Sequence, residues 1–515
     1  MKNRLILIFF ILFIQSSFLK AQNNTFSPYS RYGLGDIAPT TFAHNAGMGG
    51  AYIALKPDSL MPIFINAGNP AAYSLIKLTC LEVGGAYINS KFTGNNSSLN
   101  KWSANFAYGA LGFPIRANGG ACFGIMPYSN VGYDLRNTED ATGIGSVNYL
   151  YSGTGGLNKV FAGYGVMPFQ NRLAKFRKKH LYVPDTMKYL NKNKYKRREF
   201  GSKILSDFSM GFNVNYIFGS MEQTSRVVYP SSILYNNTYR DYALNLGDFT
   251  GNFGFQTAIT IDSVTDRQGR KDRIEKQIAV FRALGVFTDS ILSIKKDSLR
   301  AVTPLHKRHL IHKVKFTFGY FMALNNTLRA NYDAKVYNYV LSGTGAETIR
   351  DTVLFNINQK GDIHLPLEQG FGIGFKKGER INLVADFAIT NWSQFKFLND
   401  INTLKDNYRI AVGCNFVPEK YAAGSGAFFK KLNYRLGVTY QTGYIYVKNT
   451  VISNYAVTAG VGFPVGFGRL SSMVNVSAQY GQMGTTSNNL MKENYWKINF
   501  GFTFSDRWFQ KFRYD

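Results

Sequence analysis

The sequence predicts an all-β protein: a fourteen-stranded antiparallel transmembrane β-barrel with an N-terminal hatch, or plug, inside its lumen. Three observations lead to this prediction: an apolar leader, an alternation of apolar and polar residues along most of the chain, and a composition rich in aromatics and glycine. Phe and Tyr contribute 42 and 33 of the 515 residues, and glycine contributes 50. A barrel with interfacial aromatics and small lumen-facing residues has such a composition.

The amino terminus has the layout of a secretory signal. Lys2 and Arg4 precede an apolar run over residues 5–14, and a short polar stretch leads to a cleavage site after Ala21. The run is too short to span a membrane as a helix, and no later window offers about 18 uninterrupted apolar residues. We therefore expect residues 1–21 to be a cleavable signal peptide and the mature chain to lie in the outer membrane of a Gram-negative cell.

The last predicted strand shows the alternation most clearly. Over residues 495–504, one face carries Trp496, Ile498, Phe500, Phe502 and Phe504, and the other carries Lys497, Asn499, Gly501 and Thr503. The same period places strands near residues 78–88, 101–113, 119–128, 157–168, 207–219, 252–262, 313–323, 365–376, 381–391, 406–417, 431–443, 453–464, 470–482 and 494–505. The barrel is thus expected over residues 77–505, followed by a periplasmic tail over 506–515.

An even number of strands leaves both chain ends on the periplasmic side. Two periplasmic connections are then long insertions, at about residues 170–205 and 263–312. The external connections at 129–146, 220–251 and 324–364 are also long, and the last is expected to extend the barrel as a hairpin.

The first insertion is strongly basic, in a chain of formal net charge +28. Because nucleic-acid binding does not suit an exported barrel, we interpret it as a loop that faces anionic polymer, lipid headgroups or a partner protein. In the second insertion, residues 270–287 have the apolar spacing of a helix, which could cover the barrel rim or bind a partner.

Several charged residues fall at predicted lumen-facing positions. Arg409 and Arg435 lie on adjacent strands and Lys315 on a third. They are candidate ligand-binding residues, because charge-assisted hydrogen bonds would hold a ligand carboxylate in a pocket of low dielectric. The alternative is that these cations pair with acidic residues and merely hold the plug. Those residues are Asp36, Glu82, Glu368 and Asp386.

No pattern predicts an enzyme. The chain has no Gly-x-Ser-x-Gly elbow and no histidine at a clear inward strand position. His306, His309 and His312, at spacing three, do not share one face of a strand. We expect no catalytic residue, no metal site and no cofactor.

Residues 22–76 form the predicted amino-terminal arm and hatch. This glycine-rich segment is too long for a tail and is expected to fill the lumen. Residues 46–55 (AGMGGAYIAL) and the later Asn-Pro-Ala-Ala at 69–72 resemble the hatch of the FadL-type long-chain fatty-acid transporters, and the strand series from 365 to 504 is similar as well. The hatch residues that we single out are Gly49, Gly50, Asn69, Pro70 and Ala71. In the Asn-Pro-Ala element, proline restricts the backbone and asparagine tolerates turn geometry where the hatch meets the first strand. The alternative is that these residues form an ordinary turn.

The resemblance implies a barrel that takes hydrophobic molecules from an outer pocket past the hatch and releases them sideways into the membrane or into the periplasm. We therefore expect passive diffusion of hydrophobic, fatty-acid-like molecules through a hatch-gated barrel, with outer-membrane lipid and a hydrophobic or amphipathic cargo as partners. The alternative is a structural or docking subunit of an envelope or protein-export complex that uses its basic periplasmic insertions. A transporter needs an apolar pocket lined by hatch and strands, whereas a docking subunit needs only the insertions.

Overall fold

The computed structural model describes residues 24–57, 64–94, 97–172, 175, 192–230, 235–265, 307–342, 346–398, 400–401, 404–422, 427–467 and 470–506. The predicted signal peptide, the predicted helix at 270–287 and the tail beyond residue 506 lie outside the described residues, so these stay predictions.

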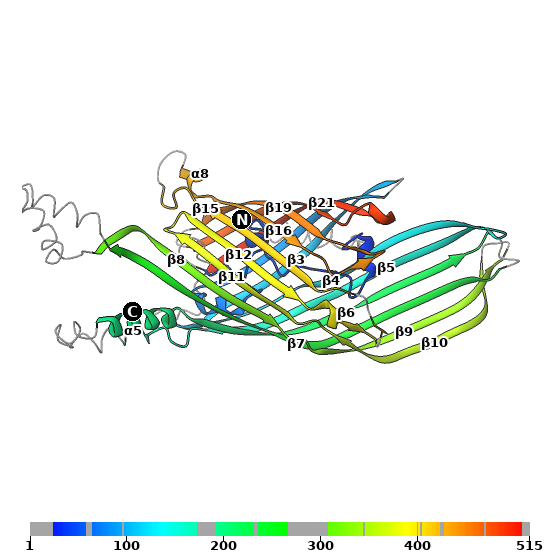
Figure 1. Ribbon diagram of the computed structural model, residues 1–515, viewed down its shortest axis with the longest axis horizontal. Coiled ribbons are helices and arrows are strands. Elements are labelled where there is room, and N and C mark those ends of the chain that lie inside the picture. Colours follow the sequence, from blue (N-terminus) through cyan, green and yellow to red (C-terminus); the bar gives the residue numbers. More distant parts are fainter. Residues whose placement is uncertain are drawn as a thin grey trace, which may run out of the picture.

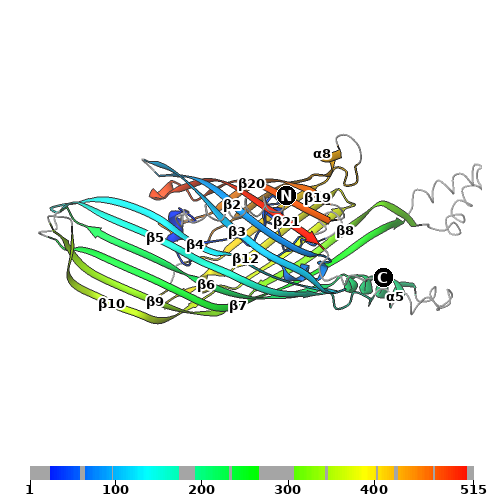
Figure 2. The same ribbon diagram turned by 180° about the vertical axis from the view of Figure 1, so that it is seen from behind.

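Fourteen antiparallel strands form a closed ring (Figures 1 and 2). In order they are β2 (Thr79–Thr93), β3 (Ser98–Arg116), β4 (Gly119–Ala141), β5 (Gly145–Val166), β6 (Ser209–Val228), β7 (Asn237–Thr265), β8 (Lys307–Ala323), β11 (Glu368–Lys377), β12 (Ile381–Thr390), β15 (Asn407–Phe416), β16 (Asn433–Gln441), β19 (Asn454–Phe467), β20 (Leu470–Met483) and β21 (Lys492–Asp506). Pairing of β21 with β2 closes the ring. The predicted fold class and strand order are confirmed.

Alternation along each strand separates a lumen face from an outer face. On β16, Arg435 is 1% exposed, whereas Leu436 and Val438 are 64% and 50% exposed. On β21, Trp496 and Phe500 are 55% and 52% exposed. Large apolar side chains on the outside of a closed ring suit contact with lipid, and the chain is an outer-membrane-type β-barrel.

One side of the barrel continues past the external rim. The long strand β7 pairs with β8 near the periplasmic rim and with β9 (Thr327–Leu341) beyond the external rim, and β9 turns back into β10 (Glu347–His364). The predicted hairpin at 324–364 is confirmed. The predicted external loops at 129–146 and 220–251 are wrong, since β4 to β7 run through most of both. These extensions were missed because, away from lipid, polar residues occupy both faces and the apolar period fades.

The wall has a seam between β3 and β4. These strands pair only where 109–116 of β3 meets 119–125 of β4, near the periplasmic rim. Beyond that point, within the described residues, β3 pairs only with β2, and β4 diverges from it to pair with β5. The short strand β1 (Asp36–Ile37) pairs instead with Asn130 and Ser129 of β4. The amino-terminal segment therefore occupies the place where the two strands separate.

The amino-terminal segment lies inside the ring, in blue in both views (Figures 1 and 2). We call residues 24–41 the arm and residues 42–76 the hatch. Their elements are η2 (Pro28–Arg31), β1, α2 (Ala43–Ala46) and η3 (Pro70–Leu75). The chain thus plugs its own barrel, as the sequence predicts.

Short helices and strands lie at the two rims of the barrel. They are η4 (Trp392–Gln394), β13 (Lys396–Phe397), β14 (Asp400–Ile401), β17 (Tyr446–Val447), β18 (Thr450–Val451), η5 (Ser487–Asn489), α5 (Lys192–Ser206) and α8 (Ala427–Lys431). Helix α5, from the first basic insertion, lies at the end of the barrel opposite the β9–β10 hairpin (Figure 1). None of the helices in the described part of the chain is long and apolar enough to cross a membrane.

Candidate functional site

Inward glycines of the wall receive the backbone of the hatch. A Cβ built on Gly437 would lie 2.2 Å from the Gly49 nitrogen, and one on Gly319 would lie 2.1 Å from the Ile53 oxygen. Real Cβ atoms do not approach backbone so closely. Only glycine lets the wall and the hatch touch here, so these positions fix how the hatch sits in the ring.

Gly49 and Gly50 form a left-handed turn, with φ values of +67° and +71°. Both are buried, and the Gly49 N–H donates to the Thr458 hydroxyl at 2.8 Å. The Gly50 carbonyl accepts from Arg409 Nη1 at 3.2 Å. This turn ties the hatch to two strands of the wall.

Asn69, Pro70 and Ala71 lie at the start of η3, fully within the barrel. The Asn69 side chain accepts from the Ala71 N–H at 3.2 Å and donates to the Ile53 carbonyl at 2.8 Å. Pro70 takes the first helical position, where no N–H is needed. The element caps a helix and cross-links two parts of the hatch.

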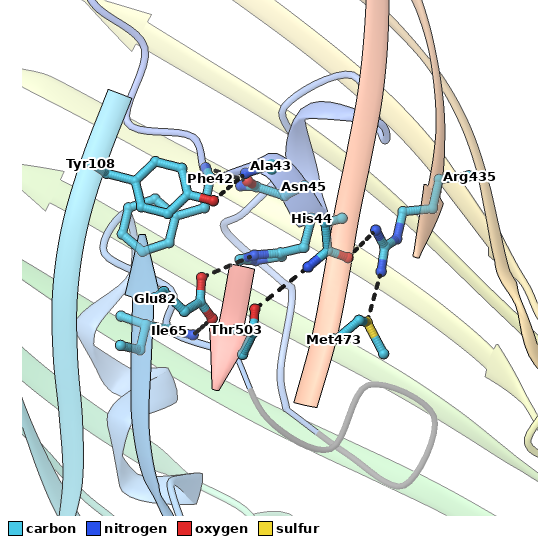
Figure 3. Close-up of polar contacts among 11 residues, drawn as sticks. Phe42, Ala43, His44, Asn45, Ile65, Glu82, Tyr108, Arg435, Met473 and Thr503 are labelled. Carbon is cyan, nitrogen blue, oxygen red and sulfur yellow. Dashed lines mark hydrogen bonds and ion pairs between the residues drawn. The ribbon is translucent and has the colours of Figure 1, made fainter. Parts of the chain in front are cut away.

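Two buried carboxylates bind the hatch backbone. Asp386 on β12 accepts from the N–H groups of Tyr52 and Ile53 at 2.6 and 2.8 Å. Glu82 on β2 accepts from the Ile65 N–H at 2.8 Å and lies 3.6 Å from the His44 ring (Figure 3). Both residues therefore serve as hatch anchors through the hatch itself, whereas the alternative considered above had them paired with the three cations.

Arg435 and its partners form a closed network in the wall. Its guanidinium donates to Asn475 at 2.7 Å and to Asn415 at 3.2 Å. It also contacts the Met473 sulfur (Figure 3). The side chain is 1% exposed. A ligand cannot reach a guanidinium enclosed in this way, so the contacts favour a structural role for Arg435.

Lys315 lies on the lumen side of β8, near Lys56 of the hatch. Burial, with a smaller contribution from the Lys315 charge, lowers the pKa of Lys56 to about 7. The Lys56 ammonium donates to the Asp207 carbonyl at 2.9 Å. Lys315 does not line the cavity described next.

A cavity of about 390 Å³ lies between the hatch, the arm and the external half of the wall. Arg409 lines it and lies over the Tyr52 ring, 5.0 Å from the ring centroid. The Arg409 Nη2 atom is buried and makes no hydrogen bond within the described residues. Of the three predicted ligand-binding cations, the structure therefore places only Arg409 at the cavity.

The cavity has further charged residues that the sequence reasoning did not select. They are Lys101, Lys159, Glu493 and Lys497, together with Asp36 and Glu368, which were considered only as plug contacts. Lys497 falls on the lumen face of the last predicted strand, so its alternation was a usable signal. For the others, no local pattern indicates which inward residues the hatch leaves uncovered.

Comparison with family models identifies the family of the chain. A family model described as BamG matches residues 1–174 and 301–515, which is well over half of the sequence. The chain belongs to the BamG family. The unmatched stretch of this BamG-family chain contains α5, β6 and β7. No curated protein sequence matches the chain.

Solved barrels are similar to this BamG-family protein at low identity. The toluene transporter TodX of Pseudomonas putida is 12% identical, covering 93% of this chain and 100% of its own, with a TM-score of 0.48. A FadL homologue of Pseudomonas aeruginosa is 13% identical, covering 91% and 98%, with a TM-score of 0.44. The monoaromatic hydrocarbon channel CymD is 11% identical, covering 92% and 99%, with a TM-score of 0.42. The fold of this protein rests on the pairing of its own strands.

Proposed function

We propose that the protein passes hydrophobic and amphipathic small molecules across the outer membrane by passive diffusion, with the cavity as the binding chamber. The observation that carries this proposal is the continuity of the cavity with the seam. Asn24 and Phe26 of the arm, Ser103 of β3 and Asn130 of β4 all line the cavity. A molecule in the cavity is thus separated from the lipid beside β3 mainly by the arm.

The cavity has the size and mixed lining of a small-molecule site. Its volume is within the usual range of about 300–1,000 Å³ for ligand pockets. Apolar side chains such as Phe321, Leu365 and Trp392 share the lining with polar groups. A fatty-acid-like cargo would place its chain on these residues and its carboxylate on Arg409, which lines the cavity and whose Nη2 has no hydrogen-bond partner within the described residues. TodX is a toluene transporter and CymD a monoaromatic hydrocarbon channel, so both of those proteins take hydrophobic cargo.

Few of the contacts of the arm cross the seam itself, whereas its η2 turn is held against β4 by hydrogen bonds between Ser30 and Gly132 at 3.1 and 3.2 Å. Asn24 bridges it, since its side chain donates to Asn130 and its carbonyl accepts from Asn105 at 2.7 Å. Strand β1 pairs with β4 at two positions only. We infer that the arm leaves β4 when cargo passes sideways.

A disulfide lock tests this route. Ile37 and Ser129 are Cα partners in the antiparallel β1–β4 pair, which suits the Cα separation that a disulfide needs. We expect oxidised Ile37→Cys/Ser129→Cys barrels in liposomes to pass a fluorescent fatty acid at least tenfold more slowly, and reduction to restore the rate. Tyr446→Cys/Val451→Cys, across the β17–β18 hairpin, is the matched control. Unchanged passage through the oxidised lock would refute the lateral route.

A second candidate function is docking to a periplasmic or envelope protein. It is favoured by α5, where Arg197 and Arg198 are exposed and Phe200 is 53% exposed. Cations flanking an exposed aromatic ring are typical of a protein interface. Deletion of residues 171–202 should release co-purifying proteins while leaving passage intact if docking is a separate role. Loss of passage with no loss of partners would refute docking.

A further inference from the structure

Helix α8 lies on the lipid-facing side of the barrel wall. It belongs to the periplasmic connection over residues 417–432, between β15 and β16, at the same end of the barrel as α5 (Figures 1 and 2). The Phe429 carbonyl accepts from the Tyr434 hydroxyl at 3.1 Å. The Phe428 ring meets the Phe463 ring, with centroids 6.5 Å apart. Strand alternation places Tyr434 and Phe463 on the outer face, so the connection folds over the outside of the wall and not beneath the lumen.

Backbone hydrogen bonds hold this connection in shape. The Glu419 N–H donates to the Lys430 carbonyl at 2.9 Å, which joins the two legs of the connection. The Val417 N–H donates to the Arg380 carbonyl at 2.8 Å, which ties the connection to the turn between β11 and β12. Val417 and Ala422 are buried. These contacts give α8 a fixed place against the wall.

Three aromatic rings project from the connection. Tyr421, Phe428 and Phe429 are 74%, 54% and 66% exposed, and the two phenylalanine rings pack edge to face with centroids 5.5 Å apart. A group of exposed rings marks contact with an apolar partner. Aromatic side chains gather where a membrane protein crosses the lipid–water interface, and this group adjoins the lipid-facing wall. The acyl chains of the periplasmic leaflet are therefore the apolar phase nearest to the rings.

Positive charge accompanies the rings. The connection has one carboxylate, Glu419, and three cations, which are Lys420, Lys430 and Lys431. Three cations and one carboxylate leave two positive charges in excess. Glu419 lies 3.5 Å from Lys430, but both side chains are more than half exposed, and such a surface pair is weak.

The adjoining turns do not reverse this excess. Lys377 and Arg380 stand against Glu379 between β11 and β12, and residues 468–469 between β19 and β20 include no acid. The periplasmic rim around α8 thus has the sign that attracts a phosphate group.

We propose that α8 and the connection around it form a binding site for an anionic phospholipid of the periplasmic leaflet. Phe428 and Phe429 lie among the acyl chains, while Lys430 and Lys431 bind the phosphate. The rings need an apolar partner and the lysines an anionic one, and an anionic phospholipid offers both at the height of the rim. The proposal uses neither the cavity nor the seam, so it stands apart from the proposed function.

Spin labels test where the rings lie. In phosphatidylcholine vesicles, a nitroxide at Phe429→Cys is compared with one at Leu436→Cys on the lipid-facing wall and one at Ile349→Cys beyond the external rim. All three variants carry Cys414→Ala, because the other two cysteines are buried. We expect dissolved oxygen to relax the Phe429 label more than a water-soluble nickel chelate does, as at Leu436, and the Ile349 label to show the reverse. A Phe429 label that behaves like the Ile349 label would place α8 in water, as a surface for a protein partner, and would overturn the proposal.

Retained lipid tests the headgroup. Barrels are extracted in a mild detergent from phosphatidylcholine vesicles with phosphatidylglycerol as the minor component, and bound lipids are counted by native mass spectrometry. We expect phosphatidylglycerol to be enriched at least about threefold over its share of the vesicle. Lys430→Gln/Lys431→Gln should abolish the enrichment, whereas the charge-matched control Arg350→Gln/Lys360→Gln, at exposed positions of β10, should keep it. Absence of enrichment in the wild type, or equal enrichment in both variants, would overturn the proposal.

The passage assay is independent of these results. A barrel that enriches phosphatidylglycerol but passes no cargo retains this inference and loses transport. A barrel that passes cargo without enriching phosphatidylglycerol retains the proposed function and loses this inference.

Discussion

The substitution Gly437→Ala should loosen the hatch without changing the barrel wall. The added Cβ would lie 2.2 Å from the Gly49 nitrogen, and ordinary contact begins at 3.4 Å. The hatch backbone must therefore move by about 1.2 Å, the difference between the two distances. That shift is large enough to break the 2.8 Å bond from the Gly49 N–H to Thr458.

Two penalties set the size of the effect. Overpacking a filled site costs about 1–3 kcal/mol. A buried N–H that loses its acceptor costs about 1–3 kcal/mol more. The free energy of unfolding of the plugged state should fall by about 2–6 kcal/mol, the sum of these two ranges.

Urea titration and limited chymotrypsin digestion measure the effect. Tyr52 in the hatch is 4% exposed and precedes Ile53, so cleavage after it reports hatch release. Gly374→Ala is the control, because this inward glycine meets only the wall, with its nearest neighbour at 3.3 Å. We expect Gly437→Ala to unfold at lower urea and to be cut faster than both wild type and the control. Wild-type behaviour of Gly437→Ala would refute the view that wall glycines position the hatch.

Asp386, Arg435 and Asp36 offer three further tests, one each for the hatch, the wall and the arm. Asp386→Asn should lower the free energy of unfolding by about 1.5–3 kcal/mol, because hatch N–H groups lose a charged acceptor. The urea midpoint should fall accordingly, and an unchanged midpoint would exclude the anchor role. Arg435→Met should destabilise the barrel by about 2–5 kcal/mol, since the partners of this guanidinium are wall residues. The affinity for a fluorescent fatty acid should stay within about twofold. A selective loss of that affinity would show that Arg435 binds the ligand. Burial raises the pKa of Asp36 to about 6, so arm docking should be strongest below about pH 4 and weaken up to about pH 6. Fluorescence anisotropy of a label on Thr25→Cys should show this slope, and Asp36→Asn should remove it.

The strands of the wall were predictable because the alternation of inward and outward residues is visible within each strand. Outward Trp496 and inward Arg435 follow from alternation with no knowledge of neighbouring strands. The hatch was predictable as a plug from its length and glycine content. In both cases a short stretch of sequence contains the whole signal.

The functional positions were not predictable in this way. Arg409 and Arg435 both point into the lumen, yet Asn415 and Asn475 enclose one of them while the other faces a cavity. The difference depends on where the hatch backbone lies, which is set by contacts between residues hundreds of positions apart. Sequence periodicity describes the face of a strand, not what covers that face.

The arm and the hatch are held in different ways, and this bears on which part opens. The hatch is fixed by backbone packed against Gly437 and Gly319, and by the Asp386 carboxylate. Strand β1 of the arm has two strand pairs with β4, and the Asn24 contacts that bridge the seam lie at exposed positions. Separating β1 from β4 breaks these contacts while the hatch backbone stays against the wall glycines, and it exposes the cavity to the seam. Passage along this path needs the arm to move while the hatch stays seated, so the Ile37–Ser129 lock should stop passage in a barrel whose hatch resists chymotrypsin as well as wild type does.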